Sequence, residues 1–234
     1  MIADPVVRNW GTIGGSLCQA DPSEDLSAAF GAIRATAVIH GRDGARFVPV
    51  REFHLGPYET VVAPDELLTE LRVRIRPRGG SAYEKVARRV GDWSVAAAGT
   101  VLWLAPAAGT AADGAGARAG TTAGRPGTRP GTRPGTTAGR AGNGAADGRP
   151  VVVEAGIGLA AVGASHFVAT EAEDFLRGRP ANSATFAEAG RIAAEHCAPA
   201  ADQRGPVVYK RHLTAELTAR ALRRAAARAL GPEA

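Results

Sequence analysis

The segment Asn9–Leu26 combines closely spaced glycines with the start of a helix, and it constrains the fold more than any other part of the chain. The glycines are Gly11, Gly14 and Gly15. Because they lack β-carbons, the peptide N–H groups around them can approach a bulky anion closely. Thr12 and Ser16 add hydroxyl groups that can donate hydrogen bonds to phosphate oxygens. The segment is therefore typical of a diphosphate-binding loop, or of a tight turn that simply precedes a helix.

The residues that follow predict the beginning of this helix. Asp21 suits the N-cap position, Pro22 the first helical position and Glu24 the capping-box position. We expect a helix over residues 22–33 that buries one apolar stripe. The stripe consists of Leu26, Ala29, Phe30 and Ile33.

Composition narrows the class of protein. A chain of 234 residues can bury one large core or two small ones. Its net charge is +5, but arginine is concentrated in residues 105–150 and 209–230, so we expect no nucleic-acid partner. Cys18 and Cys197 fit no metal-ligand spacing. The sequence carries no long apolar run and no secretory pattern, and we expect a cytoplasmic protein.

Periodicity predicts an α+β fold. The expected strands are residues 36–40, 45–50, 67–76, 81–88, 94–104 and 151–163, and the expected helices are 170–178, 183–196 and 210–230. The break at Pro77–Gly80 indicates a domain boundary. Residues 105–150 repeat Thr-Thr-Ala-Gly-Arg and Gly-Thr-Arg-Pro, and we expect them to form a disordered low-complexity insert.

Several ordered motifs resemble one protein family. Residues Thr12–Ser16, followed by Ala20-Asp21-Pro22 and Asp25, resemble the second flavin-binding loop of the medium subunit of molybdenum hydroxylases. This family includes aerobic carbon monoxide dehydrogenase and xanthine dehydrogenase. The likeness continues in Phe53–Tyr58, Asp65–Glu70, Ser81–Trp93, Ala169–Glu173, Asp202–Gly205 and Tyr209–Leu213.

The resemblance implies two domains. Residues 1–78 would form the second half of a PCMH-type FAD-binding domain, with a mixed sheet and helices. Residues 79–234 would resemble the C-terminal domain of the carbon monoxide dehydrogenase flavoprotein, with a three-stranded antiparallel sheet and a helix bundle. Such subunits usually contain an earlier flavin loop of the Ala-Gly-Gly-Thr/Ser type, which has no counterpart here. We expect either a truncated start or a separate chain that supplies this half.

The resemblance also implies FAD as the cofactor and assigns site residues. The diphosphate would contact Thr12, Ile13, Gly14, Gly15 and Ser16. Asp25 would accept hydrogen bonds from the ribityl chain, although a carboxylate in a first helical turn also complements the helix dipole without any ligand.

Two further positions match family residues beside the isoalloxazine ring, namely Leu68 and Lys85. Leu68 also fits a core position, and Lys85 also fits a solvated strand position. Trp93, in the matching Gly91–Trp93 turn, could pack on the ring, but core packing is the preferred interpretation. We expect no catalytic constellation and no metal site in this chain.

The resemblance implies an oxidoreductase subunit. Iron–sulfur clusters on a small partner subunit would pass electrons to FAD here, and a large molybdopterin subunit would oxidise the substrate. We expect a dimer of heterotrimers, with peripheral membrane association through the complex as a possibility. The alternatives are a flavin-free structural subunit of the same complex and an arginine-rich nucleic-acid-binding protein.

Overall fold

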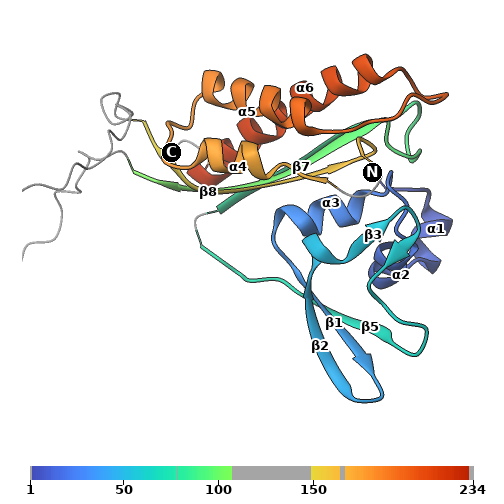
Figure 1. Ribbon diagram of the computed structural model, residues 1–234. Helices are drawn as coiled ribbons and strands as arrows, with labels where there is room; N and C mark the ends of the chain where they lie inside the picture. Colours follow the sequence, from blue (N-terminus) through green and yellow to red (C-terminus); the bar gives the residue numbers. More distant parts are fainter. Residues whose placement is uncertain (1, 78, 107–148, 164–166, 232–234) are drawn as a thin grey trace, which may run out of the picture.

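The computed structural model describes residues 2–77, 79–106, 149–163 and 167–231 (Figure 1). The helices are α1 (Pro5–Trp10), α2 (Ile13–Gln19), α3 (Asp25–Ala32), α4 (Thr170–Leu176), α5 (Ser183–His196) and α6 (Val207–Leu230), with a 3-10 helix η1 (Val50–Glu52). The strands are β1 (Thr36–Gly41), β2 (Gly44–Pro49), β3 (His54–Gly56), β4 (Glu59–Thr60), β5 (Leu67–Arg72), β6 (Gly79–Val86), β7 (Ala96–Ala105), β8 (Val151–Ala160) and β9 (Phe167–Val168). The expected α+β class is confirmed.

One antiparallel sheet, in the order β6-β7-β8-β9, forms the centre of the larger layer. Helices α4, α5 and α6 cover one face of this sheet, and α3 lies against the other face (Figure 1). The main core fills the space between the sheet and the three C-terminal helices, and it includes Leu102, Ile157, Leu176, Phe186 and Leu222.

Helix α3 lies unusually close to strand β8. A β-carbon added at Gly158 would lie 2.0 Å from the carbonyl oxygen of Ala28, and one at Gly156 would lie 1.9 Å from that of Ala32. Only glycine permits backbone to approach backbone so closely. The two glycines therefore fix how α3 lies across the sheet, and with it the position of Asp25 at the beginning of α3.

The smaller layer contains a sheet in the order β2-β1-β5 and a short β3-β4 hairpin. The β1-β2 hairpin extends away from the C-terminal helices (Figure 1). A second core, which includes Leu17, Ile39, Val50 and Phe53, lies between this sheet and helices α2 and α3. This core holds α2, the helix that carries the glycine motif, against the smaller sheet.

The prediction for the start of the helix over 22–33 is wrong by three residues. Helix α3 begins at Asp25, and Glu24 is its N-cap, because the Glu24 carboxylate accepts hydrogen bonds from the backbone N–H groups of Leu26 (2.8 Å) and Ser27 (2.6 Å). The Asp21 carboxylate instead accepts a hydrogen bond from the N–H of Ser23 at 2.9 Å, which closes a local turn.

Two predictions about strands also differ from the structure. The expected strand over 67–76 ends at Arg72, and a bulge opposite Val38 and Ile39 interrupts its two-residue period, so that Leu68 and Leu71 both face the core. The expected three-stranded sheet contains a fourth short strand, β9, at its edge. The hairpin over β1 and β2 and the helix over 183–196 lie where the sequence predicts them.

Most of the expected insert 105–150 lies outside the described residues, and its ends join two neighbouring antiparallel strands, β7 and β8. The division into domains at residue 78 stays a prediction. Within the described part of the chain, no helix combines the length and the apolar character needed to cross a bilayer.

Candidate functional site

A cleft of about 1090 Å³ lies at the end of the sheet where β6 leads into β7. Residues of α1 and α2, the first residue of α3, Lys85 and residues 89–93 line it. Five of the eight predicted cofactor-binding residues line this cleft, and they are Thr12, Gly15, Ser16, Asp25 and Lys85. The structure thus brings together residues that are up to 73 positions apart in the sequence.

The predicted glycine loop is the first turn of helix α2 rather than a separate loop. Thr12 is the N-cap, and its hydroxyl oxygen accepts a hydrogen bond from the N–H of Gly15 at 2.9 Å. A β-carbon at Gly15 would lie 2.9 Å from this oxygen, so any larger residue would disturb the cap. The N–H of Ser16 donates to the Thr12 carbonyl oxygen at 3.1 Å. The N–H groups of Ile13 and Gly14 are then the ones in this turn without an acceptor within the helix, and such groups suit an anion such as a diphosphate.

Ser16 already has a protein acceptor. Its hydroxyl donates a hydrogen bond to the Glu24 carboxylate at 2.8 Å, and the same carboxylate caps α3. This bond links the glycine helix α2 to α3. It also means that donation from Ser16 to a phosphate would require the hydroxyl to leave Glu24.

Asp25 and Lys85 form a buried ion pair at the floor of the cleft. The Lys85 Nζ atom lies 2.6 Å from Asp25 Oδ2, and the two side chains are 14% and 7% exposed. The other carboxylate oxygen, Oδ1, accepts hydrogen bonds from the Tyr83 hydroxyl and the Ser94 hydroxyl, each at 2.9 Å. Asp25 therefore has three protein donors, so its contact with a ribityl chain, as the resemblance implies, stays a prediction.

Tyr83 and Ser94, the two hydroxyl donors to Asp25, are residues of the site that the sequence did not predict. Burial, together with the neighbouring Asp25 carboxylate, raises the pKa of Tyr83 well above its ordinary value, so the phenol stays a neutral donor. Ser94 is fully buried. The useful signal in the sequence was that Tyr83 and Lys85 point to the same side of one strand, but their common partner Asp25 is 58 residues from Tyr83.

Exposed apolar side chains form much of the remaining wall of the cleft. Trp10 is 84% exposed, Trp93 is 40% exposed and Val90 is 84% exposed, and all three line the cleft. The preferred interpretation of Trp93 as a core residue is therefore wrong. Exposed aromatic and apolar groups beside backbone donors suit a ligand with both a flat ring and an anionic part.

The other three predicted residues do not line the cleft. Leu68 packs in the core of the smaller layer, which agrees with the alternative that it is a core residue. A β-carbon at Gly14 would meet the Leu68 side chain at 3.7 Å, so the side of Gly14 that lacks a side chain faces β5. Ile13 is 52% exposed on the surface of α2.

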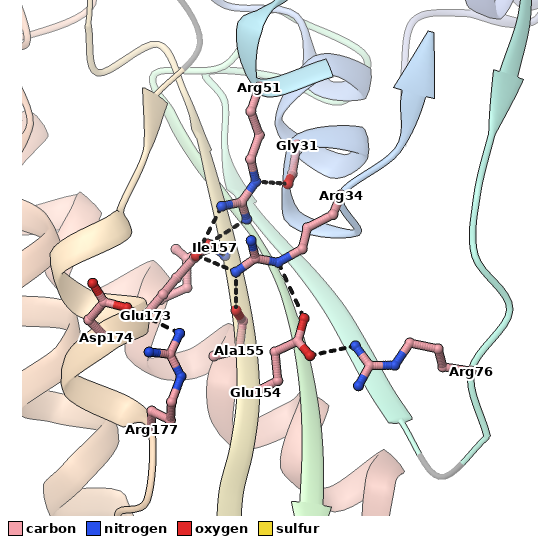
Figure 2. Close-up of polar contacts among 10 residues, drawn as sticks. All are labelled: Gly31, Arg34, Arg51, Arg76, Glu154, Ala155, Ile157, Glu173, Asp174 and Arg177. Carbon is pink, nitrogen blue, oxygen red and sulfur yellow. Dashed lines mark hydrogen bonds and ion pairs between the residues drawn. The ribbon is translucent and has the colours of Figure 1, made fainter. Parts of the chain in front are cut away.

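A second cavity of about 630 Å³ lies at the opposite end of the sheet and contains four arginines, Arg34, Arg72, Arg74 and Arg76. Figure 2 shows Glu154 between two of them. The Glu154 carboxylate lies 2.6 Å from Arg76 Nη1 and 3.4 Å from Arg34 Nε. The Arg76 guanidinium also lies 3.9 Å from the centre of the Trp103 ring. The first cleft is the better candidate for the cofactor, because five of the predicted cofactor-binding residues line it and none of the eight lines this second cavity.

Next to this cavity, Glu173 of α4 joins the two layers (Figure 2). Its side chain is 2% exposed, and it accepts hydrogen bonds from Arg51, Arg34 and the backbone N–H of Ile157. Arg51 also donates to the carbonyl oxygen of Gly31 in α3 at 2.8 Å. These contacts hold α3, and so the floor of the first cleft, against the C-terminal helices.

Comparisons with protein families define the class of protein. Residues 1–74 match the model of the FAD binding domain in molybdopterin dehydrogenase. Residues 144–225 match the model of the CO dehydrogenase flavoprotein C-terminal domain. The chain therefore belongs to the family of FAD-binding medium subunits of molybdenum hydroxylases, and the prediction of FAD as the cofactor of this class is confirmed.

Individual relatives agree with this assignment. The chain is 32% identical over 230 residues to the carbon monoxide dehydrogenase medium chain of Afipia carboxidovorans, an alignment that covers 98% of this chain and 65% of the relative. It is 37% identical over 90 residues to a putative xanthine dehydrogenase FAD-binding subunit of Escherichia coli, which covers 38% of this chain and 31% of the relative.

Solved structures give the same result. The fold matches carbon monoxide dehydrogenase from Hydrogenophaga pseudoflava with a TM-score of 0.75 and 31% identity, over 97% of this chain and 64% of that chain. It matches quinoline 2-oxidoreductase from Pseudomonas putida with a TM-score of 0.72 and 26% identity, over 98% of this chain and 65% of that chain. The chain thus spans about two thirds of the length of these relatives.

Proposed function

We propose that the chain binds FAD in the first cleft and acts as the flavoprotein subunit of a molybdenum hydroxylase complex. The observation that carries this proposal is that one cleft contains the glycine-rich start of α2, the Asp25–Lys85 pair and the exposed Trp93. The family assignment gives these features a common ligand.

The residues present suit the chemical parts of FAD. The start of α2 and the Thr12 hydroxyl would hold the diphosphate, since backbone N–H groups and the helix dipole favour negative charge there. The apolar wall with Trp93 and Val90 would hold the flat ring and exclude water. Lys85 would provide a positive charge at the floor of the cleft, where it favours an anionic form of the ligand.

Bound FAD would supply the redox chemistry, because it accepts and releases electrons that no amino-acid side chain in the cleft can carry. The contribution of this chain is to bind FAD, orient it and shield it from water. Leu68 contacts the glycine helix from the core side and would support the position of α2 without touching the ligand.

The rest of the assembly belongs to the same proposal. A small iron–sulfur subunit would deliver electrons and a large molybdopterin subunit would oxidise the substrate, with FAD passing the electrons to an external acceptor. We propose a dimer of such heterotrimers in the cytoplasm, with peripheral membrane association only through the complex. The names of the relatives, which include medium chains and subunits of several dehydrogenases, support a multisubunit assembly.

The test is to co-express the full chain with a small iron–sulfur subunit and a large molybdopterin subunit from the same organism and to purify the chain by a tag. We expect a yellow complex in which the ratio of FAD to this chain is close to one, together with both partner subunits. Mass photometry of the same sample measures the number of heterotrimers.

Two results would contradict different parts of the proposal. A folded complex with both partners but without FAD would favour the alternative of a flavin-free structural subunit. A chain that binds FAD but no partner would contradict the assembly and leave the cofactor site intact.

A further inference from the structure

The Asp25 carboxylate lies at the centre of a set of four side chains from three parts of the chain. Asp25 begins α3, Tyr83 and Lys85 lie on β6, and Ser94 lies in the connection between β6 and β7. We call these four residues the Asp25 quartet. The contacts are short, at 2.6 Å to Lys85 Nζ and 2.9 Å to each hydroxyl.

Two members of the quartet face the cleft and two do not. Asp25 and Lys85 line the cleft, whereas Tyr83 and Ser94 lie behind them and do not. Ser94 is fully buried and Asp25 is 6% exposed. Any effect of the two hydroxyl groups on a ligand in the cleft must therefore act through Asp25 and Lys85.

The hydroxyl groups change the charge that the cleft presents. A carboxylate beside Lys85 would cancel most of the ammonium charge as seen from the cleft. Two O–H dipoles directed at the carboxylate offset part of its negative charge, so more of the Lys85 charge remains effective. The geometry also fixes the carboxylate, because its Oδ1 atom is held by two donors and its Oδ2 atom by one.

We infer that Tyr83 and Ser94 are positioning residues that act through Asp25 to keep the Lys85 ammonium fixed and positively charged toward the cleft, and that the quartet thereby favours reduced over oxidised FAD. This inference rests on the proposed function for its ligand. It assigns Asp25 the role of a charge-adjusting partner of Lys85, in addition to any contact with FAD itself.

The inference predicts that some variants lower the preference for reduced FAD and that one variant raises it. The quantity is the ratio of the affinities for reduced and oxidised FAD, which the midpoint potential of the FAD in the purified complex measures. Lys85→Met should lower this ratio about tenfold, equal to ~30 mV for a two-electron couple, because the charge is lost. Tyr83→Phe and Ser94→Ala should each lower it by a smaller factor, about two- to fivefold. Asp25→Asn should raise it, since the negative charge is removed.

Two controls separate this role from a structural one. Lys85→Arg keeps the positive charge and should preserve most of the ratio. Tyr58→Phe removes an equivalent Tyr–Asp hydrogen bond, in which the Tyr58 hydroxyl donates to Asp21 at 3.0 Å on the surface, and it should leave the ratio unchanged. If Asp25→Asn does not fold, the midpoint potentials of the other five variants still test the inference.

A second measurement does not depend on FAD. In the full chain without FAD, a Lys85 ammonium held by Asp25 should give a protected ¹⁵Nζ resonance, and that resonance should broaden or vanish in Tyr83→Phe and Ser94→Ala. Absence of the protected resonance in the unaltered chain would overturn the positioning role, whether or not FAD binds. Unchanged midpoint potentials in both hydroxyl variants would overturn the effect on FAD, whereas a complex without any FAD would contradict only the proposed function and the ligand assigned to the quartet.

Discussion

Glu173 and Arg51 form a doubly hydrogen-bonded ion pair although 122 residues separate them in the sequence. The Arg51 Nη1 and Nη2 atoms donate to Glu173 Oε2 at 3.0 Å and Oε1 at 2.6 Å. Glu173 lies on α4 beside the larger sheet, and Arg51 lies on η1 in the smaller layer. The pair therefore couples the C-terminal helices to the part of the chain that carries the glycine helix.

Glu173→Gln should destabilise the fold substantially. The change leaves the largely buried Arg51 without its counter-charge, and removal of one partner of a buried ion pair costs about 3 kcal/mol or more. The half-exposed Arg34 should add little, because solvent screens it. The free energy of unfolding in urea measures the effect. Glu171→Gln, at a 51% exposed position two residues away on the same helix, should change it by less than about 0.5 kcal/mol.

Gly158→Ala should separate α3 from the sheet. The new β-carbon would lie 2.0 Å from the Ala28 carbonyl oxygen, so the helix must move, at a cost of about 1–3 kcal/mol. Because Asp25 begins this helix, the FAD content should fall as well.

Gly31→Ala is the matched control for this change. Its β-carbon would make an ordinary contact of 3.6 Å with Val168, and alanine favours the helix by about 0.5–1 kcal/mol. We expect equal or higher stability and unchanged FAD content. Equal losses in the two variants would contradict the close approach of α3 to β8.

Stability should fall as the pH falls below about 6.5 because of His54. Burial lowers the pKa of His54 from its ordinary value of 6.5, so the folded chain binds the proton less readily than the unfolded chain. The stabilisation is fully present above the unfolded pKa and is lost as the unfolded histidine takes up its proton. Denaturation curves between pH 7.5 and 5 for the unaltered chain and His54→Gln measure this difference.

The pH dependence should be weaker in His54→Gln. The exposed His40 provides a control, since His40→Gln should retain the full dependence. A pH profile that is identical in the unaltered chain and His54→Gln would show that another group causes any loss of stability in acid.

Arg74→Gln should leave the FAD content unchanged. Arg74 is exposed and lines the arginine-rich cavity, which lies at the other end of the sheet from the proposed FAD cleft. Absorbance at the flavin band, divided by the protein concentration, measures the content. A loss of FAD in a variant of normal stability would indicate that the second cavity binds part of the cofactor.

The sequence predicts local structure better than contacts between distant segments. Helix α5 and the β1-β2 hairpin follow from periodicity and turn residues, because short-range patterns determine both. The bulge in β5 depends on pairing with β1, and the capping role of Glu24 prevails over that of Asp21 because of its bonds to Leu26 and Ser27. Neither outcome is visible in a local pattern.

In the candidate site, too, contacts between distant segments could not be predicted from local patterns. The glycine motif, Asp25 and Lys85 are recognisable from their resemblance to a family, and the fold brings them to one cleft. Tyr83 and Ser94 are 58 and 69 residues from their partner Asp25, and a buried hydroxyl has no distinctive sequence pattern. Only the packing of α3 across the sheet brings these groups together.

A crystal structure of the purified complex with FAD bound tests the proposed FAD site most directly. We expect the diphosphate within hydrogen-bond distance of the first-turn N–H groups of α2 and the ring beside Trp93, with Lys85 in the same cleft. A fully occupied FAD elsewhere on the chain, with this cleft closed by the protein's own side chains, would contradict it.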